Sequence, residues 1–383
     1  MKTVSGARLI ATHARDPYHP HKLLHPYHLK RARKLLGGEI PPPSTIEIDL
    51  TDGACNQACV HCCFGSGPHR ALRSIDPDRL LAFLEVAYAN GTRAFELVGG
   101  GEPTNHARIS EIIERIHGLG VNGGEQARIG LVTNGVRLTR ILAVAHHLEW
   151  VRVSLDAPDD VTYCALHGVR AAQGHFAKVL SNIEALGKHV DVARIRLAYL
   201  VVPPINHQRD KILAATDLAS AHRVHHIAFR PAFVGHGAPR EDWWEAANAI
   251  REAKRRHGTA FALGGTGGSW DQVLGVRPHP TGPCRTRPLV MVIKADGTIP
   301  SCILFRERLK ERPPLGNIAD GFDAVWFSER HRRSLAAVNR SACPTVCKHF
   351  RADAALDEIE HVVADGDSAP AIDADTIDNP HFI

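Results

Sequence analysis

The chain has 383 residues, of which 44% are hydrophobic and nine are cysteine. This length and apolar content suit one large or two smaller globular domains, and nine thiols in so long a chain exclude a small disulfide-stapled scaffold. The sequence contains no apolar run long enough for a transmembrane helix, and its N-terminus lacks the apolar core of a signal peptide. We therefore expect a cytoplasmic protein with no membrane partner and with reduced thiols.

The net charge of +5 is unevenly distributed along the chain. Residues 352–383 contain nine Asp or Glu and neither Lys nor Arg, so the body of the chain is basic. A basic body raises the question of a nucleic-acid partner, whereas a solvated basic surface explains the same charge without one. Because no pattern of base-stacking aromatic residues accompanies the basic residues, we expect no nucleic-acid partner.

Residues 1–43 are predicted to form an N-terminal extension. Within it, HPYHLKRARKLLGGE predicts one basic amphipathic helix, which Pro26 can begin and Gly37 can end. Residues 235–282 contain a second basic helical stretch and a glycine run, and we interpret them as a connecting insertion. Residues 356–383 are acidic and rich in Asp and Ala, which favours a loose tail.

Strand-like runs alternate with helical patterns from residue 44 to residue 234. This alternation predicts a parallel sheet with helices outside it, in which chemistry gathers at the C-terminal ends of the strands. Six strands are too few to close an eight-stranded barrel, so we predict an α/β fold, an open partial (β/α)6 barrel. The predicted strands are 45–50, 93–98, 129–133, 151–156, 195–202 and 226–230, and the predicted helices are 77–90, 107–118, 137–147, 175–188 and 207–221.

The loop after the first strand carries Cys55, Cys59 and Cys62 in the spacing C-x3-C-x2-C. Three thiolates can hold three irons of a cubane cluster and leave the fourth iron open, whereas ferredoxin-type clusters use four cysteines. An open coordination position is typical of a reactive metal site. Zinc is the alternative, with His61 or Cys63 as the fourth ligand, although adjacent ligands such as Cys62 and Cys63 rarely reach one metal in relaxed geometry.

Further short motifs follow the later strands in order. GGGEP at 99–103 follows the second strand, TNG at 133–135 the third, VRVSLDA is the fourth strand, and FRP at 229–231 ends the sixth. Together with the cysteine loop they resemble the radical SAM superfamily over about residues 44–231. The chain departs from the family's common pattern at His61, where an aromatic residue is usual, and in lacking a recognisable adenine motif in the fifth strand.

The resemblance implies a cofactor site and a reaction. It implies a [4Fe–4S] cluster on the three cysteines of the loop, coordinated with S-adenosyl-L-methionine (SAM), and a flavodoxin- or ferredoxin-type electron donor. Reductive cleavage of SAM would release a 5′-deoxyadenosyl radical that takes hydrogen from a substrate. Glu102 would accept from the SAM ammonium, and Ser154 and Asp156, on one face of the fourth strand, would bind the ribose. The full set of implied cofactor contacts is Gly99, Gly100, Gly101, Glu102, Asn134, Ser154 and Asp156.

The cysteine pattern restarts after residue 283. A hairpin is predicted over 290–299 and a helix over about 322–337, so the order is Cys, hairpin, Cys, helix and a final Cys pair. This order resembles the twitch half of SPASM/twitch extensions and implies a small α+β domain over 283–355 with an auxiliary [4Fe–4S] cluster. A structural zinc knuckle is the alternative. The four candidate ligands are Cys284, Cys302, Cys343 and Cys347.

The substrate is predicted by analogy with related enzymes. One auxiliary cluster, and a barrel that starts near residue 44, favour a small polar metabolite over a leader peptide. We expect an aminoglycoside, a sugar or a nucleoside-type intermediate, as in antibiotic biosynthesis. The alternatives are a peptide maturase, a sulfur-inserting enzyme, an RNA-modifying enzyme and a zinc protein without catalytic activity. Arg230, at the end of the sixth strand, and Asn206, after the fifth, are the candidate substrate-facing residues.

Overall fold

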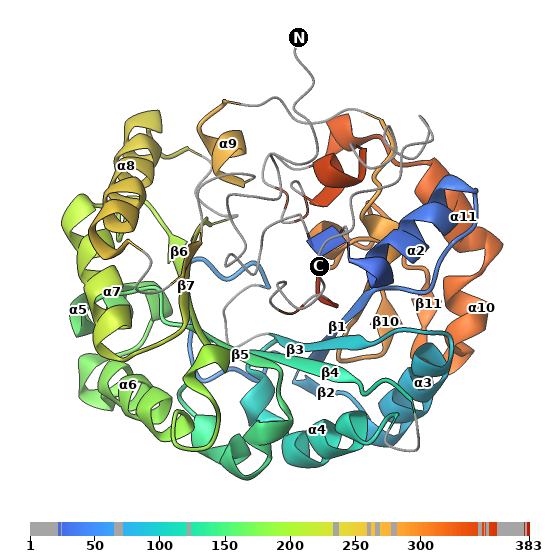
Figure 1. The fold of residues 1–383 in the computed structure, drawn as a ribbon, viewed down its shortest axis with the longest axis horizontal. Coiled ribbons are helices and arrows are strands. Elements are labelled where there is room, and N and C mark those ends of the chain that lie inside the picture. Colours follow the sequence, from blue (N-terminus) through green and yellow to red (C-terminus); the bar gives the residue numbers. More distant parts are fainter. Residues whose placement is uncertain are drawn as a thin grey trace.

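The computed structural model describes residues 22–23, 25–64, 72–120, 124–232, 237–258, 262–264, 269–276, 282–343, 347, 349, 352–357, 379 and 381–383. An open, curved parallel sheet lies at the centre of this part of the chain, with helices outside it (Figure 1). The predicted partial barrel is therefore confirmed. Its six predicted strands are adjacent in the order β1 (Thr45–Asp52), β3 (Ala94–Gly100), β4 (Arg128–Thr133), β5 (Trp150–Ser154), β6 (Ile195–Val201) and β7 (His226–Pro231).

Two further parallel strands extend the sheet at its edges. β8 (Ala262–Gly264) pairs with β7, and the helix α8 (Arg240–His257) connects them. The strand-helix alternation thus continues into the region predicted as a connecting insertion. β9 (Val290–Ile293) pairs in parallel with β1 at the other edge. Among the described residues β8 and β9 do not pair with each other, so the barrel stays open between them.

The predicted hairpin at 290–299 is wrong in its pairing. Lys294 N donates to Thr298 O (2.9 Å), as the predicted turn requires. The strands on either side of the turn nevertheless find other partners, because the edge of β1 is available to β9 and β10 (Thr298–Ile299) pairs with β11 (Gly316–Asn317). β2 (Arg73–Ser74) adds a short antiparallel pair at the C-terminal end of β1.

Most predicted helices of the barrel occur at their expected places. Asp76 caps α3 (Pro77–Ala89) by accepting from Arg79 N, as Asp before Pro predicts. The predicted helix at 137–147 is a run of 3-10 turns, η3 (Leu138–His147), and the predicted helix at 322–337 is divided in two where Ser328 caps the second part. The remaining helices are α4 (Ile109–His117), α6 (His175–Leu186), α7 (Arg209–Ala221), α9 (Ser269–Val273), α10 (Phe322–Trp326) and α11 (Glu329–Ala336).

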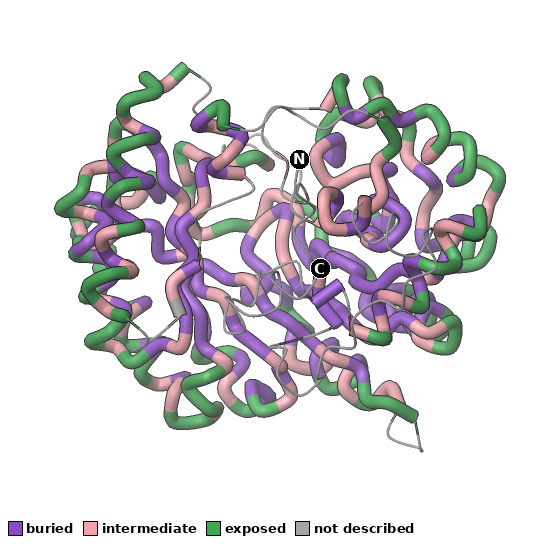
Figure 2. Tube along the Cα trace, turned by 45° about the horizontal axis from the view of Figure 1, so that its top comes forward, coloured by how far each residue is buried: buried purple, intermediate pink, exposed green. Residues whose placement is uncertain are grey.

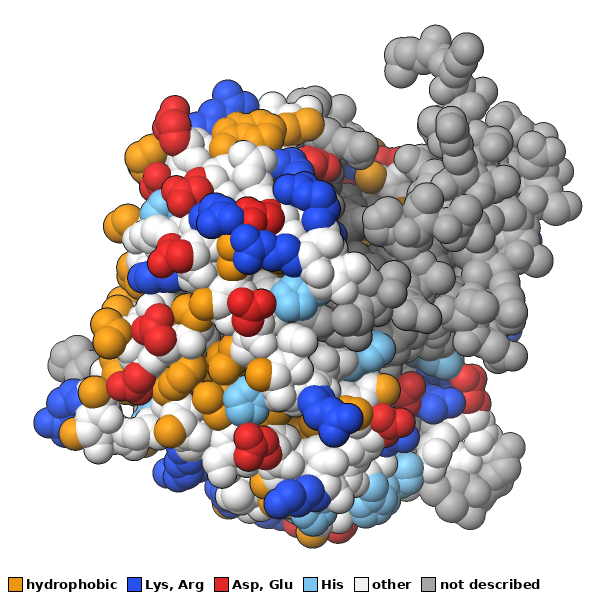
Figure 3. All heavy atoms as spheres, turned by 60° about the vertical axis from the view of Figure 1, so that its left-hand side comes forward, with side chains coloured by type: hydrophobic (Ala, Val, Ile, Leu, Met, Phe, Trp, Pro, Cys, Tyr) orange, Lys and Arg blue, Asp and Glu red, His pale blue; other side chains and the backbone are white. Residues whose placement is uncertain are grey.

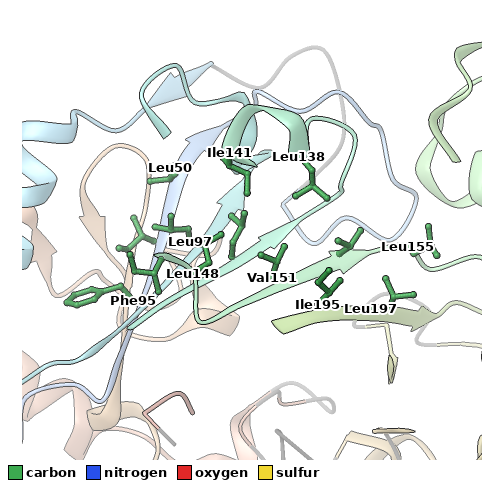
Figure 4. Packing of buried hydrophobic residues seen from close by; sticks show 14 of the residues in the cluster. Leu50, Phe95, Leu97, Leu138, Ile141, Leu148, Val151, Leu155, Ile195 and Leu197 are labelled. Carbon is green, nitrogen blue, oxygen red and sulfur yellow. The ribbon is translucent and has the colours of Figure 1, made fainter. Parts of the chain in front are cut away.

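The core lies between the sheet and the outer helices. Alternate residues of each strand face the helices, as Figure 4 shows for Leu50, Phe95, Leu97, Val151 and Leu197. Figure 2 shows the strands buried at the centre and the helices exposing their outer sides. Because each fully buried aliphatic side chain contributes about 1.5–3 kcal/mol, this one continuous cluster stabilises the barrel as a unit. The other face of every strand consequently points into the barrel.

The predicted N-terminal helix is confirmed as α2 (Pro26–Leu36), and it packs on the barrel. Arg31 is buried; its guanidinium donates to Tyr27 O (2.7 Å), Pro42 O (3.1 Å) and Gly91 O. This basic side chain therefore joins elements of the fold. On the molecular face over α7 and α8, side chains of both charge signs are interspersed (Figure 3). None of the helices in the described ranges has both the length and the hydropathy to cross a bilayer.

The acidic C-terminal segment returns to the barrel. Phe382 and His381 are buried, and the Phe382 ring lies 5.2 Å from the Trp150 ring at the start of β5. Ile383 N donates to Thr45 Oγ1 (3.1 Å) at the start of β1. The prediction of a loose tail is therefore wrong for residues 379 and 381–383, which close the N-terminal end of the barrel, while 358–378 lie outside the described residues.

Candidate active site

The first cysteine loop lies at the C-terminal end of β1. Desolvation by the surrounding protein raises the pKa of Cys55 to about 11, and the neighbouring Glu102 and Cys62 raise it further. Burial likewise raises the pKa of Cys59, with contributions from Cys55, Asp156 and Cys62. Cys62 N donates to Cys59 O (3.2 Å). The three predicted cluster ligands are thus neighbours on one short loop.

A helix that the sequence analysis missed holds this loop in place. Two backbone bonds join the loop to the end of α5 (Asp160–His167), from Ala58 N to His167 O and from Val60 N to Leu166 O, both 2.9 Å. Gly168 follows with φ +60°, and a Cβ there would lie 2.4 Å from Ala58 O. The sequence does indicate this helix, because Asp159 is a typical N-terminal cap and Gly168 a typical C-terminal one.

His167 brings an imidazole to the cluster loop. Its Nδ1 lies 3.1 Å from Cys59 Sγ, and its Nε2 lies 3.1 Å from Leu155 O. Cys59, His61 and His167 hold one sulfur and two ring nitrogens within 4.8 Å of one another. This donor set also suits zinc, so the zinc alternative involves His61, as predicted, and His167 in addition.

Asp156 lies beneath the loop and not on the strand. β5 ends at Ser154, and Asp156 has φ +59°, so the alternation of the strand does not extend to it. Its side chain is fully buried; Oδ1 accepts from Leu200 N (2.7 Å), and Oδ2 lies 3.5 Å from His61 Nε2 and 3.8 Å from His167 Nε2. The prediction that Ser154 and Asp156 share one ribose-binding face is therefore wrong.

Glu102 is buried where β3 leads into the turn at 103–105. Its Oε1 accepts from Thr104 N (3.0 Å), Thr104 Oγ1 (2.6 Å) and Thr133 Oγ1 (2.6 Å), and its Oε2 accepts from Asn134 N (2.7 Å). Burial raises the pKa of Glu102, and these four hydrogen bonds oppose the shift. The carboxylate therefore joins the turns after β3 and β4. Its contact with the SAM ammonium stays a prediction.

The glycines before Glu102 allow close backbone contacts. A Cβ on Gly99 would lie 1.8 Å from Gly101 O, one on Gly100 would lie 2.8 Å from Asp52 Oδ1, and one on Gly101 would lie 2.6 Å from Ala54 O. The turn thus presses on the cysteine loop. The predicted cofactor residue Asn134 also contacts this loop, since its Nδ2 donates to Asn56 Oδ1 (2.8 Å) and lies 4.0 Å from Cys55 Sγ.

Asn206 has a structural position. Its fully buried Nδ2 donates to Asp156 O (2.8 Å) and Leu200 O (2.7 Å), and its Oδ1 accepts from Val202 N (2.6 Å). The amide thus fixes the loop after β6 against Asp156. The prediction that Asn206 faces the substrate is wrong, whereas Arg230 is half-buried on β7 at a position that alternation directs into the barrel.

Replacing Asn206 by alanine is expected to lower the free energy of unfolding by about 2–3 kcal/mol, because buried backbone groups lose their partners. Chemical denaturation measures this change, with Asn248→Ala, an exposed position on α8, as the matched control. Unchanged stability together with a lost reaction would restore the catalytic role to Asn206.

The inner face of the sheet combines charged and small residues. Ion pairs join its cations to carboxylates: Arg152–Glu96 (3.2 Å), Lys294–Glu307 (3.1 Å) and Arg306–Asp49. Nearer the cysteine loop, four small residues are neighbours across four strands: Ser154, Ala198, Ala228 and Gly264. These four side chains take up little room on this part of the inner face.

Residues 52–215 match the family model described as the radical SAM superfamily. These residues form a radical SAM domain. The chain is 28% identical over 202 residues to a probable GTP 3′,8-cyclase of Halobacterium salinarum, which is 50% of this chain and 52% of that protein. It is 27% identical over 323 residues to the mycofactocin maturase MftC of Mycolicibacterium smegmatis, 78% of this chain and 74% of that one. The chain spans about half the length of the cyclase it matches.

Two solved structures with bound S-adenosylmethionine (AdoMet) share the fold. SuiB of Streptococcus suis, bound to S-adenosylmethionine, superposes with a TM-score of 0.62 at 14% identity, covering 81% of this chain and 72% of its own. The AdoMet-bound anSMEcpe has a TM-score of 0.56 at 16% identity, with coverage of 81% and 87%. At these identities the likeness shows the arrangement of elements and nothing about substrates.

The second cysteine set of this radical SAM protein also converges. Burial raises the pKa of Cys347 to about 12, with contributions from Cys302, Asp353 and Cys343. Burial, Asp353, Cys302 and Cys347 likewise raise the pKa of Cys284. The four thiols predicted to ligate an auxiliary cluster are therefore neighbours. Four sulfur donors fit an iron–sulfur cluster, and they equally fit a structural zinc.

Proposed function

We propose that this protein is a radical SAM enzyme that abstracts hydrogen from a small polar metabolite. Cys55, Cys59 and Cys62 would hold the [4Fe–4S] cluster, and a flavodoxin- or ferredoxin-type protein would reduce it. When bound, such a cluster supplies the electron that cleaves SAM to a 5′-deoxyadenosyl radical. The observation that carries the proposal is the position of the three thiols on one short loop, which backbone bonds to the end of α5 hold at the C-terminal edge of the barrel.

The chain's own residues would bind SAM around this loop. The backbone of Gly99–Gly101 and the side chain of Asn134 lie against the cysteine loop, which supports the predicted contacts to the methionine end of SAM. Ser154 is half-buried at the end of β5, where a ribose hydroxyl is its proposed partner. Glu102 would bind the ammonium of SAM, and it also positions Asn134, whose N donates to Glu102 Oε2 (2.7 Å). Asp156 would act indirectly, because its Oδ1 accepts from Leu200 N on β6 and its Oδ2 lies 3.5 Å from His61 Nε2 on the cysteine loop.

The inner face supports a polar and compact substrate. Cations and carboxylates pair on this face, as Arg152 does with Glu96 (3.2 Å), so the face offers both donors and acceptors. Such a face suits a molecule with several hydroxyl or amino groups, such as an aminoglycoside, a sugar or a nucleoside-type intermediate. Arg230 is the proposed substrate contact, since a guanidinium can donate to several oxygens at once.

A peptide maturase is the second candidate. The match to mycofactocin maturase extends over 78% of this chain, beyond the residues shared with the cyclase. A peptide substrate and a small metabolite are distinguished by which of them raises the yield of 5′-deoxyadenosine above that with SAM alone.

Anaerobic reconstitution with iron and sulfide tests the metal content. We expect about eight irons per chain, two cubanes' worth, and 5′-deoxyadenosine after reduction with SAM. About four irons would refute the auxiliary cluster, and a colourless zinc protein would refute the proposed enzyme. Iron analysis, EPR spectroscopy and chromatography of the products are the measurements.

A further inference from the structure

Arg287 is a buried cation within the second cysteine set. It starts the 3-10 turn η6 (Arg287–Leu289), three residues after Cys284, and its side chain is 8% exposed. Its Nε donates to Ser301 O (2.7 Å), the residue before Cys302. Arg287 thus lies between Cys284 and Cys302 in the sequence, and its guanidinium contacts the residue next to Cys302.

The hydrogen-bond partners of Arg287 are neutral. Besides Ser301 O, they are Ser334 O (3.1 Å) and Ser334 Oγ (2.8 Å) on α11. Within the described ranges no carboxylate lies at ion-pair distance from this guanidinium. Burial lowers the pKa of Arg287, and so does the nearby cation of Arg312, whereas the neighbouring thiols Cys302, Cys284 and Cys343 oppose that shift. Three of the four cysteines are therefore neighbours of this cation, and they become anionic thiolates when they bind a metal.

A buried charge without a counter-charge is costly, by several kcal/mol for an isolated ion. The neighbouring carboxylate of Asp353 does not supply one to Arg287, because it is engaged elsewhere. It accepts from Arg285 N (2.6 Å) and Thr286 N (2.9 Å) and forms an ion pair with Arg340. Among the described residues, the four thiolates of the cysteine set, once they bind iron, are the remaining counter-charge.

The two cysteine sets differ in their charged neighbours. The first set lies beside the buried carboxylates of Glu102 and Asp156. The second lies beside Asp353, whose charge Arg340 offsets, and beside two arginines, the buried Arg287 and the half-buried Arg312, with which no carboxylate forms an ion pair among the residues described. Adding an electron to a cluster adds one negative charge, which a nearby cation favours and a nearby carboxylate opposes.

We propose that Arg287 is the counter-ion of the auxiliary cluster and raises its midpoint potential. The inference rests on the auxiliary cluster of the proposed function. Arg287 acts through the cluster, so it is a positioning residue and not a catalytic one. Because of this difference in charged neighbours, we expect the auxiliary cluster to have a higher midpoint potential than the SAM-cleaving cluster.

The test uses the full-length protein with Cys55, Cys59 and Cys62 replaced by alanine, so that only the auxiliary cluster gives a signal. Its midpoint potential is measured by redox titration followed by EPR. Arg287→Gln is expected to shift the potential to more negative values, and Arg287→Lys to keep it near that of the parent because the charge remains. Arg308→Gln, an exposed arginine of the same segment, is the matched control and should leave the potential unchanged.

Each outcome decides the proposal. An unchanged potential in Arg287→Gln with about four irons bound overturns it, as does an equally lowered potential in Arg287→Lys. Loss of iron in both variants shows a purely structural role and also overturns it. Absence of iron from the triple-cysteine protein refutes the auxiliary cluster itself, and iron analysis separates that failure from a failure of Arg287 alone.

Discussion

Replacing Cys55, Cys59 and Cys62 by alanine is expected to abolish formation of 5′-deoxyadenosine. The three thiols are the ligands proposed for the SAM-cleaving cluster, and without them no iron is held at the C-terminal edge of β1. About four irons per chain should remain on the second cysteine set. Anaerobic reconstitution, iron analysis and chromatography of the SAM cleavage products measure both effects.

Cys63→Ala is the matched control for this triple variant. Cys63 is an exposed thiol beside Cys62, so it differs from the ligands mainly in its position on the loop. We expect Cys63→Ala to keep about eight irons and full SAM cleavage. Loss of SAM cleavage in Cys63→Ala, or its survival in the triple variant, would contradict the proposed ligand set.

Replacing Phe382 by alanine should lower the free energy of unfolding by about 3 kcal/mol, the usual cost of deleting a buried aromatic ring. Phe382 is 4% exposed and packs against Trp150 and Ala94 at the N-terminal end of the barrel. The variant would leave a space beneath the charged inner face. Urea denaturation under anaerobic conditions, followed by tryptophan fluorescence, measures the change.

Leu72→Ala is the control for Phe382→Ala. Its side chain is 76% exposed, so its removal should change stability by less than about 0.5 kcal/mol. Equal stability of Phe382→Ala and the wild-type protein would show that the C-terminal segment does not pack in the barrel in solution.

The parts of the fold that could be predicted are those that short sequence patterns indicate. The six inner strands, the cysteine spacing and the motifs after β3 and β4 are each written within a few consecutive residues. Strand alternation and helix capping are local effects, so the sequence indicates them directly. Helix α5 also carried such a signal, in Asp159 and Gly168, and could have been predicted.

Side-chain roles were harder to predict because they depend on what lies opposite. Asp156 is two residues beyond the end of β5, and its positive φ turns it toward His61 and His167. Glu102 and Asn206 have the residue types of ligand-binding groups, yet backbone groups and, for Glu102, two threonine hydroxyls also hydrogen-bond their side chains. No spacing rule distinguishes a free carboxylate or amide from an occupied one.

The sequence by itself determined the family resemblance, the barrel order and the two sets of cysteines, since these rest on spacing along the chain. The tertiary structure decided the contacts between distant segments. β9 joins β1 across more than two hundred residues, and Phe382 packs on Trp150 across a similar distance along the chain. Such contacts depend on which edges and apolar faces the rest of the fold leaves uncovered, and that is known only once the chain has folded.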